Sequence, residues 1–219
     1  MLFRYLRVSF CVLTACCLVP SVSACYSGLV IMPTVDRVGE NTYSLEYQMD
    51  GSISGRRADT HILNTQVGLG SRAEIGVDFD LSDRAETRAM LNAKLTLVSS
   101  PKQKYEVAAG VYNVGRHLKA CPYVVGAHNC CDSRLHLGIV KIENKARWMI
   151  GADHPLNERV TLMADWTNGN ENAASVGMNY VISDSVSLLA GVYLPNASGE
   201  DEGFSVHFCC AGPFRGSGK

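Results

Sequence analysis

A strict alternation of apolar and polar residues runs through this sequence, and it is clearest in residues 173–194. Val176, Met178 and Tyr180 alternate with small or polar residues, and after an interruption at residues 183–185 the pattern resumes at Val186. A period of two is that of a β-strand, in which successive side chains point to opposite faces. The stretch therefore predicts a β-hairpin with one apolar face and one face of Ser, Gly and Asn.

The same pattern repeats along the chain from residue 42 onward. We count about twelve segments in this register, each followed by a turn signal, and helical periodicity is not convincing in any of them. The pattern predicts an all-β protein, either a sandwich or a barrel.

The polar face of these segments distinguishes a sandwich from a barrel. A solvated face would be rich in Lys, Glu and Thr, whereas this face combines acidic residues with many glycines. Glycine weakens a strand interior unless the backbone bends or another group approaches closely. The apolar face carries no ionisable residue at its central positions, as lipid contact requires, because Lys or Arg at the bilayer midplane costs about 2–4 kcal/mol. We therefore predict a transmembrane antiparallel β-barrel of about twelve strands; a secreted soluble β-sandwich is the alternative.

The N-terminus has the layout of a secretory signal peptide. Arg4 and Arg7 precede an apolar stretch and a small-residue cleavage site, so residues 1–24 are predicted to be removed. The sequence around Cys25 also fits a lipoprotein box, in which Cys25 would be lipidated. No later apolar run reaches the roughly 18 residues of a spanning helix. The predicted division is a signal peptide at 1–24, an N-terminal periplasmic or plug segment at 25–41, the barrel at 42–210 and a polar tail at 211–219.

The connections between the predicted strands alternate in length. Mostly shorter turns are expected on the periplasmic side with both termini, and longer loops outside. The predicted periplasmic turns are residues 70–72, 99–104, 130–133, 154–158 and 183–185.

A short apolar segment before the first strand does not follow the alternation. It contains Gly28, Leu29, Pro33 and Thr34. Proline cannot donate to a β-ladder, so this segment is a poor spanning strand. We expect it to lie inside the barrel as a plug or along the periplasmic mouth.

Ionisable residues on the polar face are the candidate lumen site. In a channel they would form a constriction that orients a polar solute or sugar, and a net acidic lumen would favour cations. The competing interpretation is a solvated or mutually paired interior that keeps the barrel rigid. The candidates are Glu46, Glu74, Asp78, Lys94, Glu106, Arg134, His136, Arg147, Asp153, Asp165 and His207.

No catalytic, metal or cofactor site is predicted. A lipid hydrolase barrel would need a Ser–His pair with an orienting acid near the outer rim, but His207 is predicted to face inward and Ser205 beside it has no evident acidic partner. Six cysteines remain after residue 24, and their adjacent pairs fit zinc spacings poorly. A net charge of −1 argues against a nucleic-acid partner.

Several short motifs resemble one known family. Residues 28–34 (GLVIMPT), 67–77 (VGLGSRAEIGV) and 91–94 (LNAK) resemble the opening segment, a hairpin and a strand of YjbH-like outer-membrane barrels, which are associated with exopolysaccharide production. The resemblance implies a location in the outer membrane of a Gram-negative-type bacterium, and this chain would be a single-barrel member, whereas YjbH-like proteins can be much longer. It also implies a link to surface polysaccharide, and it supplies no catalytic residue.

Two functions remain open from the sequence. The first is a porin-like barrel, or one accessory to polysaccharide export, with membrane lipid and a small polar solute or polysaccharide as partners. The second is a structural or surface-interaction barrel with a closed lumen. The oligomeric state is not predicted.

Overall fold

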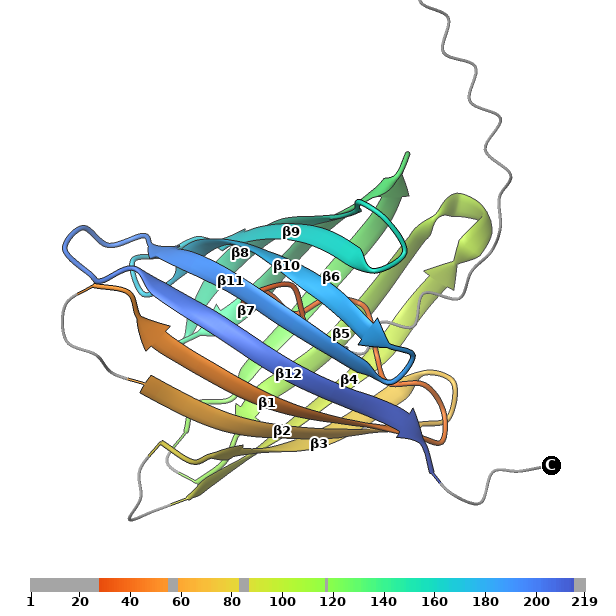
Figure 1. Ribbon diagram of the computed structural model, residues 1–219, viewed down its shortest axis with the longest axis horizontal. Helices are drawn as coiled ribbons and strands as arrows, with labels where there is room; N and C mark the ends of the chain where they lie inside the picture. The colour runs from red at the N-terminus through yellow and green to blue at the C-terminus, as the bar shows by residue number, and fades with distance from the viewer. Residues whose placement is uncertain (1–27, 55–58, 83–86, 117, 215–219) are drawn as a thin grey trace, which may run out of the picture.

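The computed structural model describes residues 28–54, 59–82, 87–116 and 118–214, and it shows a closed barrel of twelve antiparallel strands (Figure 1). The predicted fold class is thus confirmed. The strands are β1 (Thr42–Ser52), β2 (Asp59–Leu69), β3 (Ala73–Asp80), β4 (Arg88–Ser100), β5 (Tyr105–Val114), β6 (Cys121–Cys130), β7 (Ser133–Ile142), β8 (Lys145–Pro155), β9 (Val160–Thr167), β10 (Ala173–Ser183), β11 (Val186–Pro195) and β12 (Gly203–Pro213).

Each strand pairs with its neighbour in sequence, and β1 pairs with β12 to close the sheet. The closing ladder runs from Thr42 opposite Pro213 to Ser52 opposite Gly203. β12 therefore continues three residues past the barrel end predicted at residue 210, because Ala211 and Gly212 still pair with Ser44 and Tyr43.

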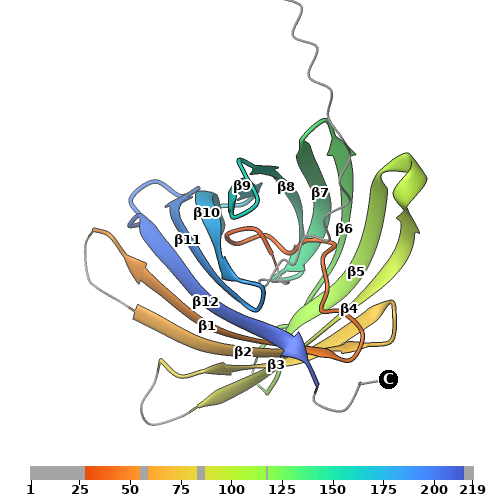
Figure 2. The same cartoon turned by 45° about the vertical axis from the view of Figure 1, so that its right-hand side comes forward.

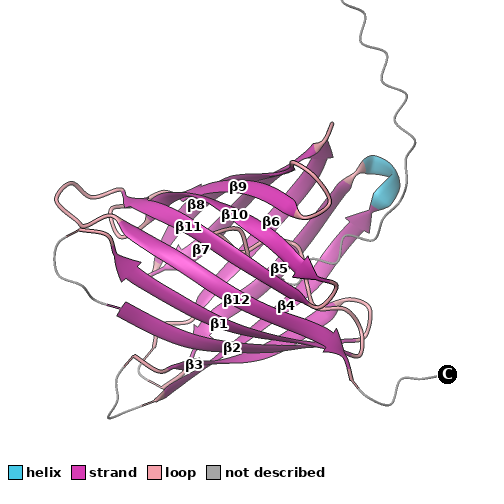
Figure 3. Ribbon diagram, viewed as in Figure 1, coloured by secondary structure: helices cyan, strands magenta, loops and turns pink. Residues whose placement is uncertain are grey.

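Nearly all the described chain is strand or connection (Figure 3). A 3₁₀ turn, Pro101–Gln103, lies between β4 and β5. Among the described residues, no helix is long and apolar enough to cross a membrane. The connections at residues 70–72, 131–132 and 184–185 are short and share one end of the barrel with the start of β1 and the end of β12, whereas residues 196–202 form a longer loop at the other end.

The two faces of the strands differ as the alternation predicts. Outward side chains are large and apolar, and Leu137 (60% exposed) and Trp148 (58% exposed) are examples. Inward positions hold buried polar residues such as Glu46, Glu74 and His136. In a water-soluble protein the apolar side chains would lie inside and the polar ones outside; here the order is reversed. An apolar belt therefore surrounds the barrel.

Residues 28–41, called the N-terminal segment below, run inside the barrel before β1 begins (Figure 2). The segment starts with a tight turn, in which Gly28 bridges to Pro33 and the amide of Leu29 donates to the carbonyl of Met32 at 2.8 Å. Near its end, Glu40 makes a parallel bridge to Gly68 of β2. The side chains of Leu29, Val30, Met32, Thr34, Val35 and Val38 are buried.

Candidate functional site

Asp165 holds the tip of the N-terminal segment in the middle of the lumen. Its Oδ2 accepts hydrogen bonds from the amides of Val30 at 2.9 Å and Ile31 at 3.3 Å. Asp165 lies on β9 and is buried. Carboxylate-to-amide hydrogen bonds are charge-assisted and stronger than neutral ones. This acidic side chain, which the alternation places in the lumen, thus binds backbone of the chain itself.

Glycines on the wall make room for the same tip. A Cβ at Gly177 of β10 would lie 2.6 Å from Cγ2 of Val30, and one at Gly191 of β11 would lie 2.7 Å from its Cγ1. Any larger residue would collide with the N-terminal segment. The inward glycines at these two positions therefore reflect close approach by another part of the chain, the condition under which glycine is found within strands.

Arg134 ties the middle of the N-terminal segment to β7 and β8. Its two Nη atoms lie 2.6 Å from the two carboxylate oxygens of Asp36, and its Nε lies 2.9 Å from Oδ2 of Asp153. The same Asp153 oxygen is 2.7 Å from Nε2 of His136. These four residues form a continuous polar cluster between the N-terminal segment and the barrel wall.

The charge of Asp36 is set by this cluster. Burial alone would raise the pKa of Asp36, but the adjacent Arg134 guanidinium more than compensates and holds that pKa below its ordinary value. Asp36 is therefore ionised at neutral pH, and the ion pair is complete under those conditions.

Glu74 and Lys94 bind the end of the N-terminal segment from β3 and β4. Oε2 of Glu74 accepts from the amide of Val38 at 2.6 Å, and Oε1 lies 3.2 Å from Nζ of Lys94. Lys94 also donates to the backbone carbonyl of Asp36. Both side chains are almost fully buried, as buried charges are only when paired. The segment is thus held at its start, middle and end.

An apolar patch of the wall covers the other side of the N-terminal segment. Met32 and Val35 form one buried cluster with Val125 of β6, Val140 of β7 and Met149 of β8. Sequence alternation did not reveal this patch, because β6 (CPYVVGAHNC) is apolar on both faces and its inward side cannot be chosen by periodicity. The lumen wall is therefore apolar on one side of the segment and polar on the other.

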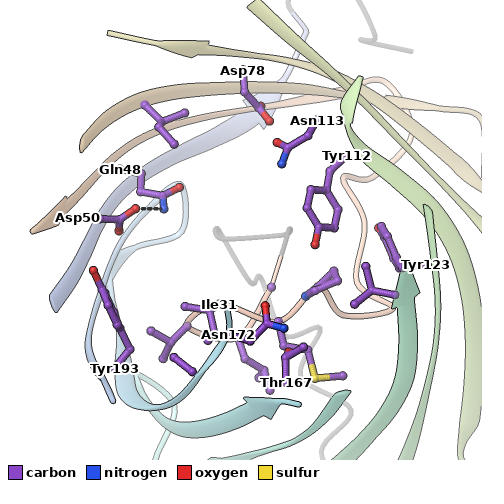
Figure 4. Close-up of a pocket in the computed structure, with 18 of the residues that line it drawn as sticks. Ile31, Gln48, Asp50, Asp78, Tyr112, Asn113, Tyr123, Thr167, Asn172 and Tyr193 are labelled. Atoms are coloured by element: carbon purple, nitrogen blue, oxygen red, sulfur yellow. Dashed lines mark hydrogen bonds between the residues drawn. The ribbon is translucent and has the colours of Figure 1, made fainter. Parts of the chain in front are cut away.

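Beyond the tip of the N-terminal segment lies a cavity of about 970 Å³. Residues 28–33 form its floor, the inward side chains of the strands form its wall, and residues 170–172 and 200–201 lie at its mouth. Figure 4 shows Gln48, Asp50 and Asp78 on one side of this space, and Tyr112, Tyr123 and Tyr193 around the rest. The lumen is therefore open on the loop side and narrowed by the segment on the turn side.

A hydrogen-bonded chain joins β1 to β12 along the cavity wall. Nδ1 of His207 lies 2.9 Å from Oε1 of Glu46, and its Nε2 lies 2.7 Å from Oγ of Ser205. Ser205 thus has an acid–histidine pair beside it, contrary to the sequence expectation that the third member is missing. Its hydroxyl, however, donates to Asp50, and Ser205 is only 1% exposed and does not line the cavity. A nucleophile must reach its substrate, and the buried Ser205 hydroxyl cannot. This series of hydrogen bonds is therefore structural.

The remaining candidates are spread along the barrel. Asp78 faces the cavity and accepts from Asn92 at 2.9 Å. Arg147 lies toward the mouth, where its Nε is 2.6 Å from Oε1 of Glu171. Glu106 is half-buried on β5. The structure thus groups most of the candidates into a part that binds the N-terminal segment (Glu74, Lys94, Arg134, His136, Asp153 and Asp165) and a part that lines the cavity (Glu46, Asp78 and His207). Glu74 and Lys94 belong to both parts.

Several residues of the site were not singled out from the sequence. They are Asp36, Gln48, Asp50, Asn64, Gln66 and Asn92. The amides and Asp50 occupy inward positions of β1, β2 and β4, so the alternation that marks the other candidates also marks them. Asp36 has no such signal, because it precedes the first strand.

Within the described residues, the cysteines and the side chains that could bind a metal form no second site. Cys209 is disulfide-bonded, while Cys121, Cys130, Cys131 and Cys210 are free. In the part of the chain that the structure describes, no group of three His, Cys, Asp or Glu side chains is arranged to hold a metal ion. Cys25, the candidate for lipidation, lies outside the described residues.

No family model and no curated protein matches the sequence. The structure, in contrast, is similar to solved outer-membrane barrels at 10% identity. These include KdgM porin in complex with disordered oligogalacturonate (TM-score 0.61, covering 77% of this chain and 98% of that chain) and NanC porin (TM-score 0.53, covering 77% and 98%). The Acinetobacter baumannii outer membrane protein Omp33 is similar at a TM-score of 0.50, covering 81% of this chain and all of that chain. The chain therefore shares the barrel fold of outer-membrane porins.

Proposed function

We propose that this protein is an outer-membrane channel of the porin type, whose pore is closed by the N-terminal segment and opens when that segment moves. The observation that carries the proposal is the way residues 28–41 are held. Beside its apolar contacts, the segment is held by ion pairs and carboxylate-to-amide hydrogen bonds at its start, middle and end, and water can replace these polar contacts.

The surface and the lumen both support this function. The outward apolar residues suit contact with lipid, as in other barrels of this fold, and export by the predicted signal peptide would deliver the chain to the outer membrane.

A cavity of about 970 Å³ opposite the N-terminal segment is large enough for a solute of several rings. We infer that the solute is a saccharide, since KdgM porin, which shares the fold, has been solved with an oligogalacturonate. The resemblance to YjbH-like barrels adds a proposed link to surface polysaccharide.

A second function, a structural barrel that never opens, is favoured by one observation. Met32 and Val35 belong to a fully buried apolar cluster with the wall, and breaking such contacts costs more than exchanging ion pairs with water.

Conductance in planar bilayers distinguishes the two functions. We expect purified full-length protein to be mostly closed with brief openings, and a variant lacking residues 29–36 to conduct continuously. Heat-modifiable mobility on gels would verify that the shortened variant still forms a barrel. If neither the full-length protein nor the shortened variant conducts, the barrel is structural and closed. If both conduct continuously and equally, the segment does not close the pore.

A further inference from the structure

Excess negative charge distinguishes the cavity on the loop side of the N-terminal segment. Among the residues that the structure describes, seven carboxylates line it, together with one lysine, one histidine and no arginine. The lysine, Lys94, is already paired with Glu74 at 3.2 Å. Within a narrow space with low-dielectric walls, like charges reinforce one another and concentrate counter-ions.

Two of these carboxylates have uncharged hydrogen-bond donors. Asp50 accepts from Nε2 of Gln48 at 2.7 Å and from the hydroxyl of Ser205, and Asp78 accepts from Nδ2 of Asn92 at 2.9 Å. Neutral donors orient a carboxylate but leave its charge in place. Glu200 and Asp201 add further negative charge at the mouth. A cation that enters the cavity therefore meets carboxylates that are held in place by uncharged donors, which do not neutralise their charge.

The rest of the wall suits a solute that carries hydroxyl groups. Gln48, Asn64, Gln66, Asn92 and Asn113 all face the cavity. Each amide offers both donors and acceptors, and a hydroxyl group needs one of each. A simple metal cation or an alkyl amine would leave most of these amides without a ligand partner.

Three tyrosines complete the wall (Figure 4). Tyr112 and Tyr123 form a tilted pair with ring centroids 5.9 Å apart, and Tyr193 comes from β11, across the cavity. Tyrosine combines an apolar ring face with a polar hydroxyl, and the ring face also attracts ammonium groups. Such rings can bind the apolar faces of saccharide rings as well as a protonated amine.

We propose that this cavity binds cationic, polyhydroxylated solutes of the amino-sugar class in preference to neutral or acidic saccharides. The inference rests on the proposed channel function for its biological meaning, but binding itself needs no pore opening. It assigns the solute a charge opposite to that of the oligogalacturonate in the KdgM structure.

Three trisaccharides test the charge requirement directly. The first is a glucosamine trimer, the second its N-acetylated and therefore neutral counterpart, and the third a galacturonic acid trimer. Calorimetric titration at about pH 7, with full-length protein in a zwitterionic detergent without sugar, measures each affinity. We expect the glucosamine trimer to bind about tenfold or more tightly than the neutral trimer, as one charge-assisted hydrogen bond would give, and the acidic trimer to bind most weakly.

Variants locate the effect within the cavity. Asp50→Asn combined with Asp78→Asn should reduce the preference for the glucosamine trimer over the neutral trimer. Asp184→Asn, which removes a carboxylate at an exposed turn on the opposite end of the barrel, should leave it unchanged. Equal affinity for the charged and neutral trimers, tighter binding of the acidic trimer, no binding of any trimer, or a preference unaltered by the double variant would each overturn the inference.

The outcome is separable from that of the proposed function. Selective binding by a protein that never conducts would keep this inference and reject the channel. Conductance without selective binding would support the channel and reject the inference about the solute.

Discussion

Arg134 of β7 and Asp36 of the N-terminal segment form a two-point ion pair, with both Nη–Oδ distances at 2.6 Å. Asp153 of β8 contacts Nε of the same guanidinium at 2.9 Å. Arg134 thus keeps one carboxylate partner on the wall if the N-terminal segment leaves. Release of the segment would therefore not leave an unpaired arginine inside the barrel. An unpaired charge is the main cost of breaking an ion pair in the interior, and this pair is partly buried.

Removing this ion pair should open the pore. Arg134→Gln is expected to shift the closed-to-open equilibrium by about 1.5–3 kcal/mol, the range for hydrogen bonds to charged groups, because the guanidinium no longer binds Asp36. Single-channel recording measures this as a rise in open probability.

Lys119→Gln is the matched control for that variant. It removes an exposed ion pair with Glu143 near the loop end, where the two side chains are 68% and 63% exposed, so the open probability should not change. The double variant Asp36→Asn with Arg134→Gln should behave like the single Arg134 variant if the two residues act through each other. If the two substitutions raised the open probability additively, the ion pair would not be what holds the segment.

Acid should release the N-terminal segment. Arg134 holds the pKa of Asp36 below its ordinary value, so the pair stabilises the closed state fully above about pH 4, the ordinary Asp pKa. That stabilisation is lost as the pH falls through the lowered pKa of Asp36, and open probability should rise in this acidic range. Asp36→Asn should show a high open probability already at neutral pH and a smaller rise in acid. An identical acid response in this variant would assign the effect to other carboxylates.

Local periodicity predicted the strands and the face of each lumen candidate, because both depend only on neighbouring residues. Glu46 and His207 each follow the alternation of their own strand. Their contact at 2.9 Å, between residues 161 positions apart, requires the closing ladder, in which Glu46 lies opposite Cys209 and Gln48 opposite His207. Strand parity predicts that such a ladder exists but not its register.

The path of the N-terminal segment was less accessible to sequence reasoning. Pro33 and the apolar run predicted a segment outside the strands, within the lumen or at its mouth. Its contacts depend on Asp36, Asp165 and the inward glycines, which belong to different periodic elements or to none. The sequence left two expectations open, a lumen that orients a solute and a mutually paired interior. Paired side chains occur both against the N-terminal segment, as in Arg134 with Asp36, and along the cavity, as in Glu46 with His207, so pairing alone does not separate the two.

A larger residue at a wall glycine should displace the tip of the N-terminal segment. Gly191→Val places its Cβ 2.7 Å from Val30, which we expect to destabilise the closed state by about 1–3 kcal/mol, as overpacking does. Hydrogen exchange at the amides of Val30 and Ile31 should accelerate, because their bonds to Asp165 would loosen. Gly126→Val is the control: its Cβ has no neighbour closer than 3.7 Å, and the amides should exchange as in the unaltered protein. Unchanged exchange in the Gly191 variant would show that the tip does not rest against β11.

A charge on the outer face tests whether that face contacts lipid. Leu137, in the middle of β7, points outward and is 60% exposed. In a bilayer Leu137→Arg should lower the unfolding free energy by about 2–4 kcal/mol, the cost of arginine near the midplane, whereas on a water-facing surface the effect would stay within about 0.5 kcal/mol. The same substitution at Leu156, an exposed residue in the connection between β8 and β9, should cost little in either case because that position lies at the barrel end. Denaturant titration of protein folded into lipid vesicles measures both values. Equal, small effects at the two positions would mean that the apolar belt does not lie in a membrane, and the proposed channel would fall with it.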